Sequence, residues 1–177
     1  MPEWYGGSTL NSSNSTPPQN QWRDQWERTL RWYGQVHQIE QKSLQQDLKI
    51  GDIDVVIAFF QNCYHLRDWL LVSRPTLKGP LEKFFRTHFE MGACRDICNG
   101  FKHKDLDRPT HDNDFNLYRE YDHLEAIGRG GNSPVRHRVV FAVGSGIRKF
   151  DIFELAGSCA ELWKQFLIEN GLGVIAD

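Results

Sequence analysis

The segment GDIDVVIAFFQNCYHLRDWLLVS (residues 51–73) carries its apolar side chains at the spacing of an α-helix. Val56, Phe59, Cys63 and Leu70 fall on one broad face. An acidic residue near the start, Asp52 or Asp54, suits the positive end of a helix dipole. The segment therefore predicts a long helix with one face buried.

The segments on either side have helical patterns of their own. Residues 19–46 form an amphipathic pattern whose predicted buried stripe is Trp22, Trp26, Leu30, Tyr33, Val36 and Ile39. The tryptophans favour core packing, and a stacking platform for nucleic-acid bases is the alternative. Proline and glycine in RPTLKGP (residues 74–80) break the chain, and a third helix is predicted over residues 81–103.

The C-terminal part mixes strand and helix signals. Residues 104–134 are polar and predict a loop, with a short strand within it left open. Residues 135–150 alternate around Gly144 and Gly146, which is typical of a β-hairpin. The last helix is predicted over residues 151–171, with Gly171 as its C-cap and with a buried stripe of Leu155, Cys159, Leu162, Trp163 and Phe166.

These elements predict a mainly α fold. Short connections favour antiparallel neighbours, so we expect an antiparallel four-helix bundle with a β-hairpin inserted before the last helix. A hairpin is marginal alone and must pack on the bundle. Residues 1–18 are rich in Ser, Asn, Gly and Pro and predict a disordered arm, which leaves residues 19–177 as one domain.

Composition narrows the function. The formal net charge of −2 gives no global field for nucleic acid, so such binding needs a local patch. The four cysteines are widely spaced and predict reduced thiols packed in a core, with no metal site and no cofactor. The start lacks the pattern of a signal peptide, and no apolar run could span a bilayer, which together predict a cytoplasmic protein with no membrane partner.

The third predicted helix carries the candidate chemistry in CRDICNGFKHKDL (residues 94–106). On a helical wheel Cys94, Ile97, Cys98 and Phe101 form a buried stripe. The opposite side gathers the polar side chains of Arg95, Asn99, Lys102 and His103. An ordinary solvated helix face is the simpler interpretation of this grouping.

A phosphodiester site is the functional interpretation of the same four residues. Arg95 and Lys102 would hold phosphate by charge-assisted hydrogen bonds, and Asn99 would contact a substrate oxygen or fix a ring tautomer. His103 would be the general acid or base, because the imidazole pKa lies near neutral. RNA carries its own nucleophile, the 2′-hydroxyl, so no metal is required.

Residues outside this helix extend the predicted substrate site. His65 lies off the apolar stripe of its helix and could pair with Asp68, although a packed histidine is the simpler interpretation. Arg136 and Arg138 share one strand face of the hairpin and would contact phosphate. Charged hairpins also serve to prevent edge pairing, which leaves this assignment open.

The segments FFQNCYHLRDWL and ICNGFKHKDL resemble a group of uncharacterised bacterial and phage proteins. More distantly, a helical bundle with an Arg…His pair on a late helix is similar to the HEPN superfamily. That resemblance implies a metal-independent ribonuclease of a toxin or antiphage system, acting as a dimer whose Arg-polar-x-x-x-His helices face each other. Arg95 and Asp96 match the start of that motif, and Arg95 and His103 would be catalytic. The Arg95-to-His103 spacing is longer than the family's.

Two functions therefore stand at this point. The first is a HEPN-like protein that acts on RNA, with RNA and a second copy of the chain as partners. The second is a non-enzymatic interaction module that binds a protein through the polar face of residues 81–103.

Overall fold

A computed structural model describes residues 20–43, 48–102, 115–123, 135–143 and 148–173. Most of these residues are helical, which confirms the mainly α prediction. The predicted arm (residues 1–18) and His103 lie outside the described residues. In chain order the elements are α1 (Gln21–Ser43), α2 (Ile50–Ser73), the 3₁₀ turn η2 (Pro75–Leu77), α3 (Lys78–Thr87), α4 (Phe89–Lys102), β1 (Phe115–His123), β2 (Val135–Val143), β3 (Arg148–Asp151) and α5 (Ile152–Glu169).

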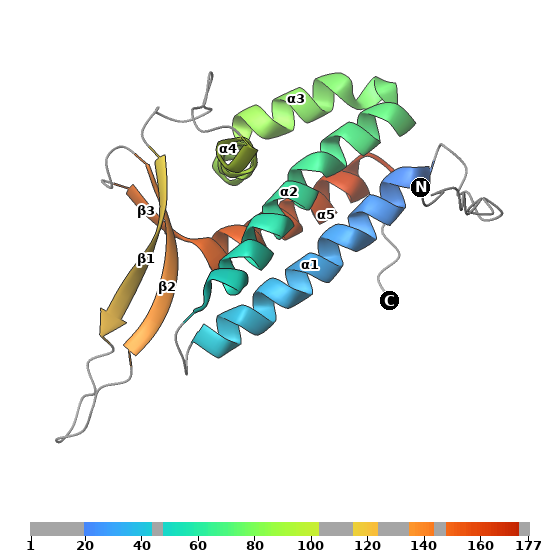
Figure 1. The fold of residues 1–177 in the computed structure, drawn as a ribbon. Coiled ribbons are helices and arrows are strands. Elements are labelled where there is room, and N and C mark those ends of the chain that lie inside the picture. Colours follow the sequence, from blue (N-terminus) through green and yellow to red (C-terminus); the bar gives the residue numbers. More distant parts are fainter. Residues whose placement is uncertain (1–19, 44–47, 103–114, 124–134, 144–147, 174–177) are drawn as a thin grey trace, which may run out of the picture.

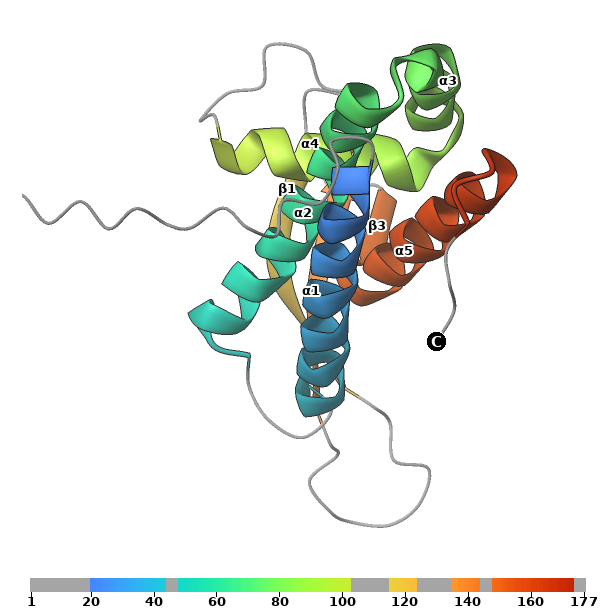
Figure 2. The same cartoon turned by 90° about the vertical axis from the view of Figure 1, so that its right-hand side faces the viewer.

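The helices pack into one body with the sheet at one side (Figure 1). Helices α1 and α2 run antiparallel and α5 packs against both, while α4 lies across α2 on the side nearer the sheet. After a quarter turn the length of α4 is visible above α1 and α5 (Figure 2). One hydrophobic cluster includes buried side chains from α1, α2, α3, α4 and α5.

The buried stripe of α1 differs from the prediction at one position. Trp22, Trp26, Val36 and Ile39 are buried, which makes the two tryptophans core residues rather than an exposed stacking platform. Leu30 is 41% exposed, and its neighbour Thr29 is buried instead. The Thr29 hydroxyl donates to the Gln25 carbonyl one turn earlier (2.9 Å), so its polar group is satisfied inside the helix.

Helix α2 has the predicted buried face and the predicted acidic start. Phe59, Phe60 and Leu66 are fully buried. The Asp52 carboxylate accepts a hydrogen bond from the Lys49 backbone N–H (2.7 Å) and pairs with the Lys42 ammonium of α1 (2.7 Å). This carboxylate therefore joins the beginning of α2 to the end of α1.

The prediction of one helix over residues 81–103 is wrong, because the chain bends at His88. Its backbone is extended (φ −102°, ψ 118°), α3 ends at Thr87, and α4 begins at Phe89. On one side of the bend the Phe84 ring packs on Phe166 of α5, with centroids 4.7 Å apart. On the other side the Phe89 ring packs on Phe150 of β3, with centroids 4.4 Å apart. The two shorter helices therefore make separate aromatic contacts, α3 with α5 and α4 with β3.

A three-stranded antiparallel sheet occupies the region where a hairpin was predicted. Strand β2 pairs with β3 with Phe141 opposite Phe150, and β1 pairs with β2 along its full length, from Phe115 opposite Val143 to His123 opposite Val135. The predicted loop before residue 135 contains the strand that the sequence left open: β1 is nine residues long. Its polar composition hid a strand whose backbone is paired by β2.

Helix α5 closes the core. Its N-cap Asp151 accepts a hydrogen bond from the Phe153 backbone N–H (2.9 Å), and Gly171 follows its last turn with φ +68°. Of its predicted stripe, Leu155, Cys159, Trp163 and Phe166 are buried. Across the described ranges, none of the helices has both the length and the apolar character that spanning a bilayer requires.

Candidate functional site

Two opposite faces of α4 define the candidate site. Cys94, Ile97 and Cys98 are buried, which confirms the predicted stripe. Arg95 and Asn99 lie one turn apart and are partly exposed, and we call this pair the polar strip. The helix continues through Gly100 to Lys102, whose side chain, like all of His103, lies outside the described part of the chain.

The polar strip rests on a buried carboxylate. Asp96 is only 1% exposed, and its Oδ1 lies 3.6 Å from Nε of Arg95, whose side chain is 32% exposed. This ion pair involves Nε of the guanidinium and not the two Nη groups, which form the fork that binds phosphate.

Helix α2 brings further polar groups to the same edge. Burial raises the pKa of the half-buried Tyr64 hydroxyl, and the positive charges of Arg67 and Arg95 only partly offset that rise. Arg67 Nη1 donates to Asp68 Oδ1 (3.1 Å). Since the charges of both arginines and of Asp68 act on the Tyr64 hydroxyl, these α2 residues and Arg95 form one electrostatic neighbourhood.

The predicted pairing of His65 with Asp68 is not what the structure contains. Asp68 pairs with Arg67, while the exposed His65 ring lies beside Tyr64 with a centroid separation of 6.4 Å. His65 therefore remains near the α2 edge of the site through its contact with Tyr64, without a carboxylate to orient it.

The sheet register bears on the two arginines assigned to phosphate. Arg136 lies opposite Asp122 and Arg138 opposite Glu120, so each basic residue of β2 has an acidic partner position on β1. The formal charges of these four residues cancel. Their part in substrate binding stays a prediction. Because acidic residues lie opposite both arginines, an anion site is more favoured at α2 and α4 than at the sheet.

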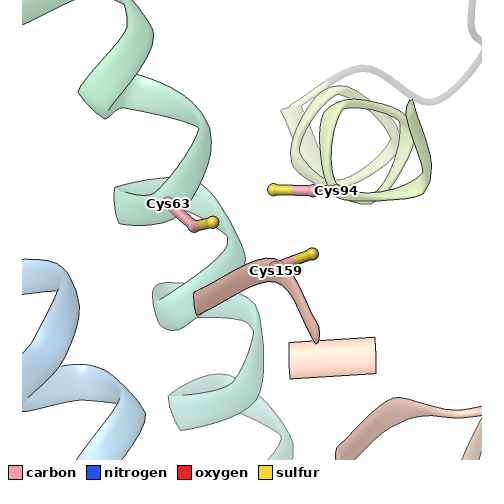
Figure 3. A group of neighbouring side chains, drawn as sticks. All are labelled: Cys63, Cys94 and Cys159. Carbon is pink, nitrogen blue, oxygen red and sulfur yellow. The ribbon is translucent and has the colours of Figure 1, made fainter. Parts of the chain in front are cut away.

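Sequence reasoning missed a second cluster altogether. Cys63 of α2, Cys94 of α4 and Cys159 of α5 point toward one another (Figure 3), and their three Sγ atoms lie within 4.8 Å of each other. All four cysteines are free and buried, as predicted, but wide spacing along the chain did not mean separation in space. Each of the three lies on a buried helical stripe. The spacing of apolar residues predicts that each cysteine is buried, but it does not predict that the three buried stripes meet.

The pKa values of the three clustered thiols depend on one another. Burial raises the pKa of Cys94 and of Cys159 well above the ordinary range of a thiol, and interaction with the Cys63 sulfur raises both further. Burial also acts to raise the pKa of Cys63, but interactions with the side chains of Cys159, Cys94 and Trp163 outweigh it and lower that pKa to about 5.

Comparison of the chain with protein-family models, with curated proteins and with solved structures finds no match. The functional argument therefore rests on the residues themselves.

Proposed function

We propose that this chain is a HEPN-like, RNA-acting protein with metal-independent endoribonuclease activity, in which the polar strip of α4 binds the phosphodiester. We also propose that residues 19–177 form one domain related to an antiparallel four-helix bundle with a β-hairpin inserted before the last helix. The proposal also keeps the toxin or antiphage context that the resemblance implies.

One observation carries the proposal. From Met91 to Cys98 every residue of α4 except Arg95 is buried, and Asn99, one turn further on, is again partly exposed. Arg95 is held by the nearly inaccessible Asp96 and shares its surroundings with Tyr64 and Arg67 of α2. A partly exposed arginine that pairs through Nε with a buried acid is suited to binding a phosphate oxyanion through its two Nη groups.

The roles follow from side-chain chemistry. Arg95 neutralises the phosphodiester and stabilises the charge that develops on it, while Asn99 and Lys102 support the same group. His103, directly after the last residue of α4, moves protons. As base it accepts the proton of the 2′-hydroxyl, which attacks phosphorus, and as acid it then returns a proton to the departing 5′-oxygen. His65 contacts the RNA from α2, and Arg136 and Arg138 contact it from the sheet. A homodimer with the two α4 helices facing each other would place two strips on one RNA.

The test uses the full-length chain and a fluorescent single-stranded RNA in the presence of a chelator. We expect cleavage by the wild type, and a loss of about 100-fold or more with His103→Ala, the range typical of a general acid or base. Arg95→Ala should reduce cleavage about as strongly, and Arg95→Lys should restore it only in part, because lysine lacks the planar fork. Arg86→Ala is the matched control, since it removes the same charge from an exposed position of α3.

Two results would overturn the proposal. One is RNA left intact by clean, folded wild-type protein. The other is cleavage that survives both His103→Ala and Arg95→Ala, which would trace the activity to a contaminant.

The alternative is a non-enzymatic module that binds a protein through the same face. Such a module would use the contact-making side chains of Arg95 and Asn99 on α4 and of Arg67 and His65 on α2, and it would need no proton transfer. In that case Arg95→Ala and Asn99→Ala would weaken capture of a partner from cell extract, and neither the wild type nor any variant would cleave RNA.

A further inference from the structure

The three-thiol cluster has the geometry of a metal site. Its Sγ atoms lie within 4.8 Å of one another. An equilateral triangle of that side has its centre about 2.8 Å from each corner, so an inward shift of roughly half an ångström reaches the ~2.3 Å metal–sulfur distance of zinc thiolate sites. Rotation about the Cα–Cβ bonds supplies shifts of this size without moving the helices.

Each thiol is held by a different helix and oriented by its neighbours. The Cys94 thiol donates to the Phe60 carbonyl (3.5 Å), and the Cys159 thiol donates to the Glu90 carbonyl (3.4 Å). The indole N–H of Trp163 donates to the Cys63 carbonyl (3.0 Å), which ties the Cys63 turn of α2 to α5. These contacts position the helices and thiols in the metal-free chain. The two S–H hydrogen bonds are given up when the metal–sulfur bonds form, whereas the Trp163 contact remains as a support of the site.

The ligand chemistry selects the class of ion. Thiolate sulfur prefers soft metals, above all copper(I) and zinc, over magnesium or calcium. Zinc in structural sites takes four protein ligands, and its three-ligand sites keep an open position for water. Within the described residues this group comprises three thiols and is fully buried, so it fits an ion that is satisfied by sulfur alone.

We propose that Cys63, Cys94 and Cys159 form a binding site for a single soft metal ion of the copper(I) class, held between α2, α4 and α5. Metal–sulfur bonds replace S–H bonds, the protons leave to solvent, and the ion stays in its +1 state throughout. Each of the three thiols loses its proton as its metal–sulfur bond forms.

The site would also hold α4 in place. Cys94 immediately precedes Arg95, so an ion bound at the cluster fixes the helix that carries the polar strip against α2 and α5. The metal site does not depend on the proposed RNA function, and it can be tested without RNA.

The experiment titrates the reduced, full-length chain with copper(I) under anaerobic conditions against a chromophoric copper(I) chelator. Because the thiols are fully buried, a parallel sample is refolded from denaturant with copper(I) present, which removes slow entry as an obstacle. Cys98→Ser is the matched control, since Cys98 is the remaining buried cysteine and lies outside the cluster.

We expect the wild type and Cys98→Ser to bind one ion per chain, with coordination by sulfur alone in X-ray absorption and a higher Tm with the metal than without. Cys63→Ser, Cys94→Ser and Cys159→Ser should each bind about 100-fold more weakly and lose the Tm increase. The corresponding Cys→Ala variants, which introduce no hydroxyl into the core, repeat the measurement if a serine variant does not fold.

Three outcomes would overturn the proposal. Neither the titrated nor the refolded wild type retains copper(I); or Cys98→Ser weakens binding as much as the cluster variants do; or zinc alone binds more tightly than copper(I) and with a non-sulfur ligand. The last result would show that a fourth group completes the site and that the ion belongs to a different class.

Discussion

The two faces of α4 place consecutive residues in opposite environments. Cys94 is fully buried and lies near sulfur atoms from α2 and α5, whereas Arg95 is partly exposed and its charge acts on the Tyr64 hydroxyl of α2. The polar strip is a local consequence of helical periodicity on one segment. The thiol cluster comes from three segments that are distant in the chain. The difference teaches that one helix can carry two candidate sites, of which the wheel reveals one.

The substitution with the largest expected effect on the free energy of unfolding is at Trp163, which packs beside the thiol cluster. Trp163→Ala removes a fully buried ring that contacts Phe84, Phe85 and Phe166 and donates to the Cys63 carbonyl. We expect the free energy of unfolding to fall by about 3–5 kcal/mol, the range for truncating a buried aromatic. Urea denaturation of the reduced chain measures it. The exposed neighbour Lys164→Ala should change little, and equal losses in the two variants would contradict a packed core at α5.

A smaller effect is expected beneath the polar strip. Asp96→Ala removes the buried carboxylate beside Arg95 and should cost about 1–3 kcal/mol, as loss of a buried polar partner does. Arg95 is partly exposed, so its share of the pair is screened by solvent and should be at most ~1 kcal/mol. A double-mutant cycle with Arg95→Gln measures the coupling by urea denaturation. Strict additivity would mean that Asp96 does not orient Arg95.

The ion pair between Lys42 and Asp52 lies away from both faces of α4 and gives a test of how a charged pair contributes to stability. The pKa of Asp52 is lowered: burial opposes the shift, but hydrogen bonds from Lys42 and from the Lys49 N–H outweigh it. A carboxyl whose pKa is lower in the folded state contributes stability above its unfolded pKa and loses it as the pH falls through the folded value.

In the wild type, stability should therefore decline below about pH 4 partly through Asp52, and Asp52→Asn should remove about 1 kcal/mol at neutral pH and flatten that decline. Urea denaturation across the acidic range is the measurement. The exposed Asp54→Asn serves as the control. An unchanged acid profile in Asp52→Asn would contradict the assignment.

The smallest expected effect on stability separates binding from folding at the strip. Asn99→Ala truncates a partly exposed side chain and should change the free energy of unfolding by no more than ~0.5 kcal/mol. Affinity for single-stranded RNA, measured by fluorescence anisotropy at fixed salt, should fall about 10-fold, since one hydrogen bond to a charged group is lost. A variant that is destabilised but binds RNA normally would make Asn99 structural.

Much of the helical pattern was predictable because it is local. The stripes of α2 and α5 and the buried side of α4 agree with the spacing of their apolar residues. The stripe of α1 was predicted wrongly at Leu30, because an internal hydrogen bond lets Thr29 be buried. Composition suggested a loop at β1, but the strand exists because β2 lies beside it.

Two features depend on contacts between distant residues. The bend at His88 follows the division of aromatic contacts between α5 and β3, and no helix-breaking residue occurs at that point. The thiol cluster requires α2, α4 and α5 to meet at one depth.

The sequence by itself determined which segments are helical, which faces of them are apolar, and that Arg95 and Asn99 lie on the side of α4 away from Cys94. Those properties depend on neighbours within a turn or two of the chain. The tertiary structure alone decided that residues 81–103 form two helices, that an acid is buried beneath Arg95, and that three cysteines meet. Such properties depend on how closely packed helices share a core, and spacing along the chain does not encode that geometry.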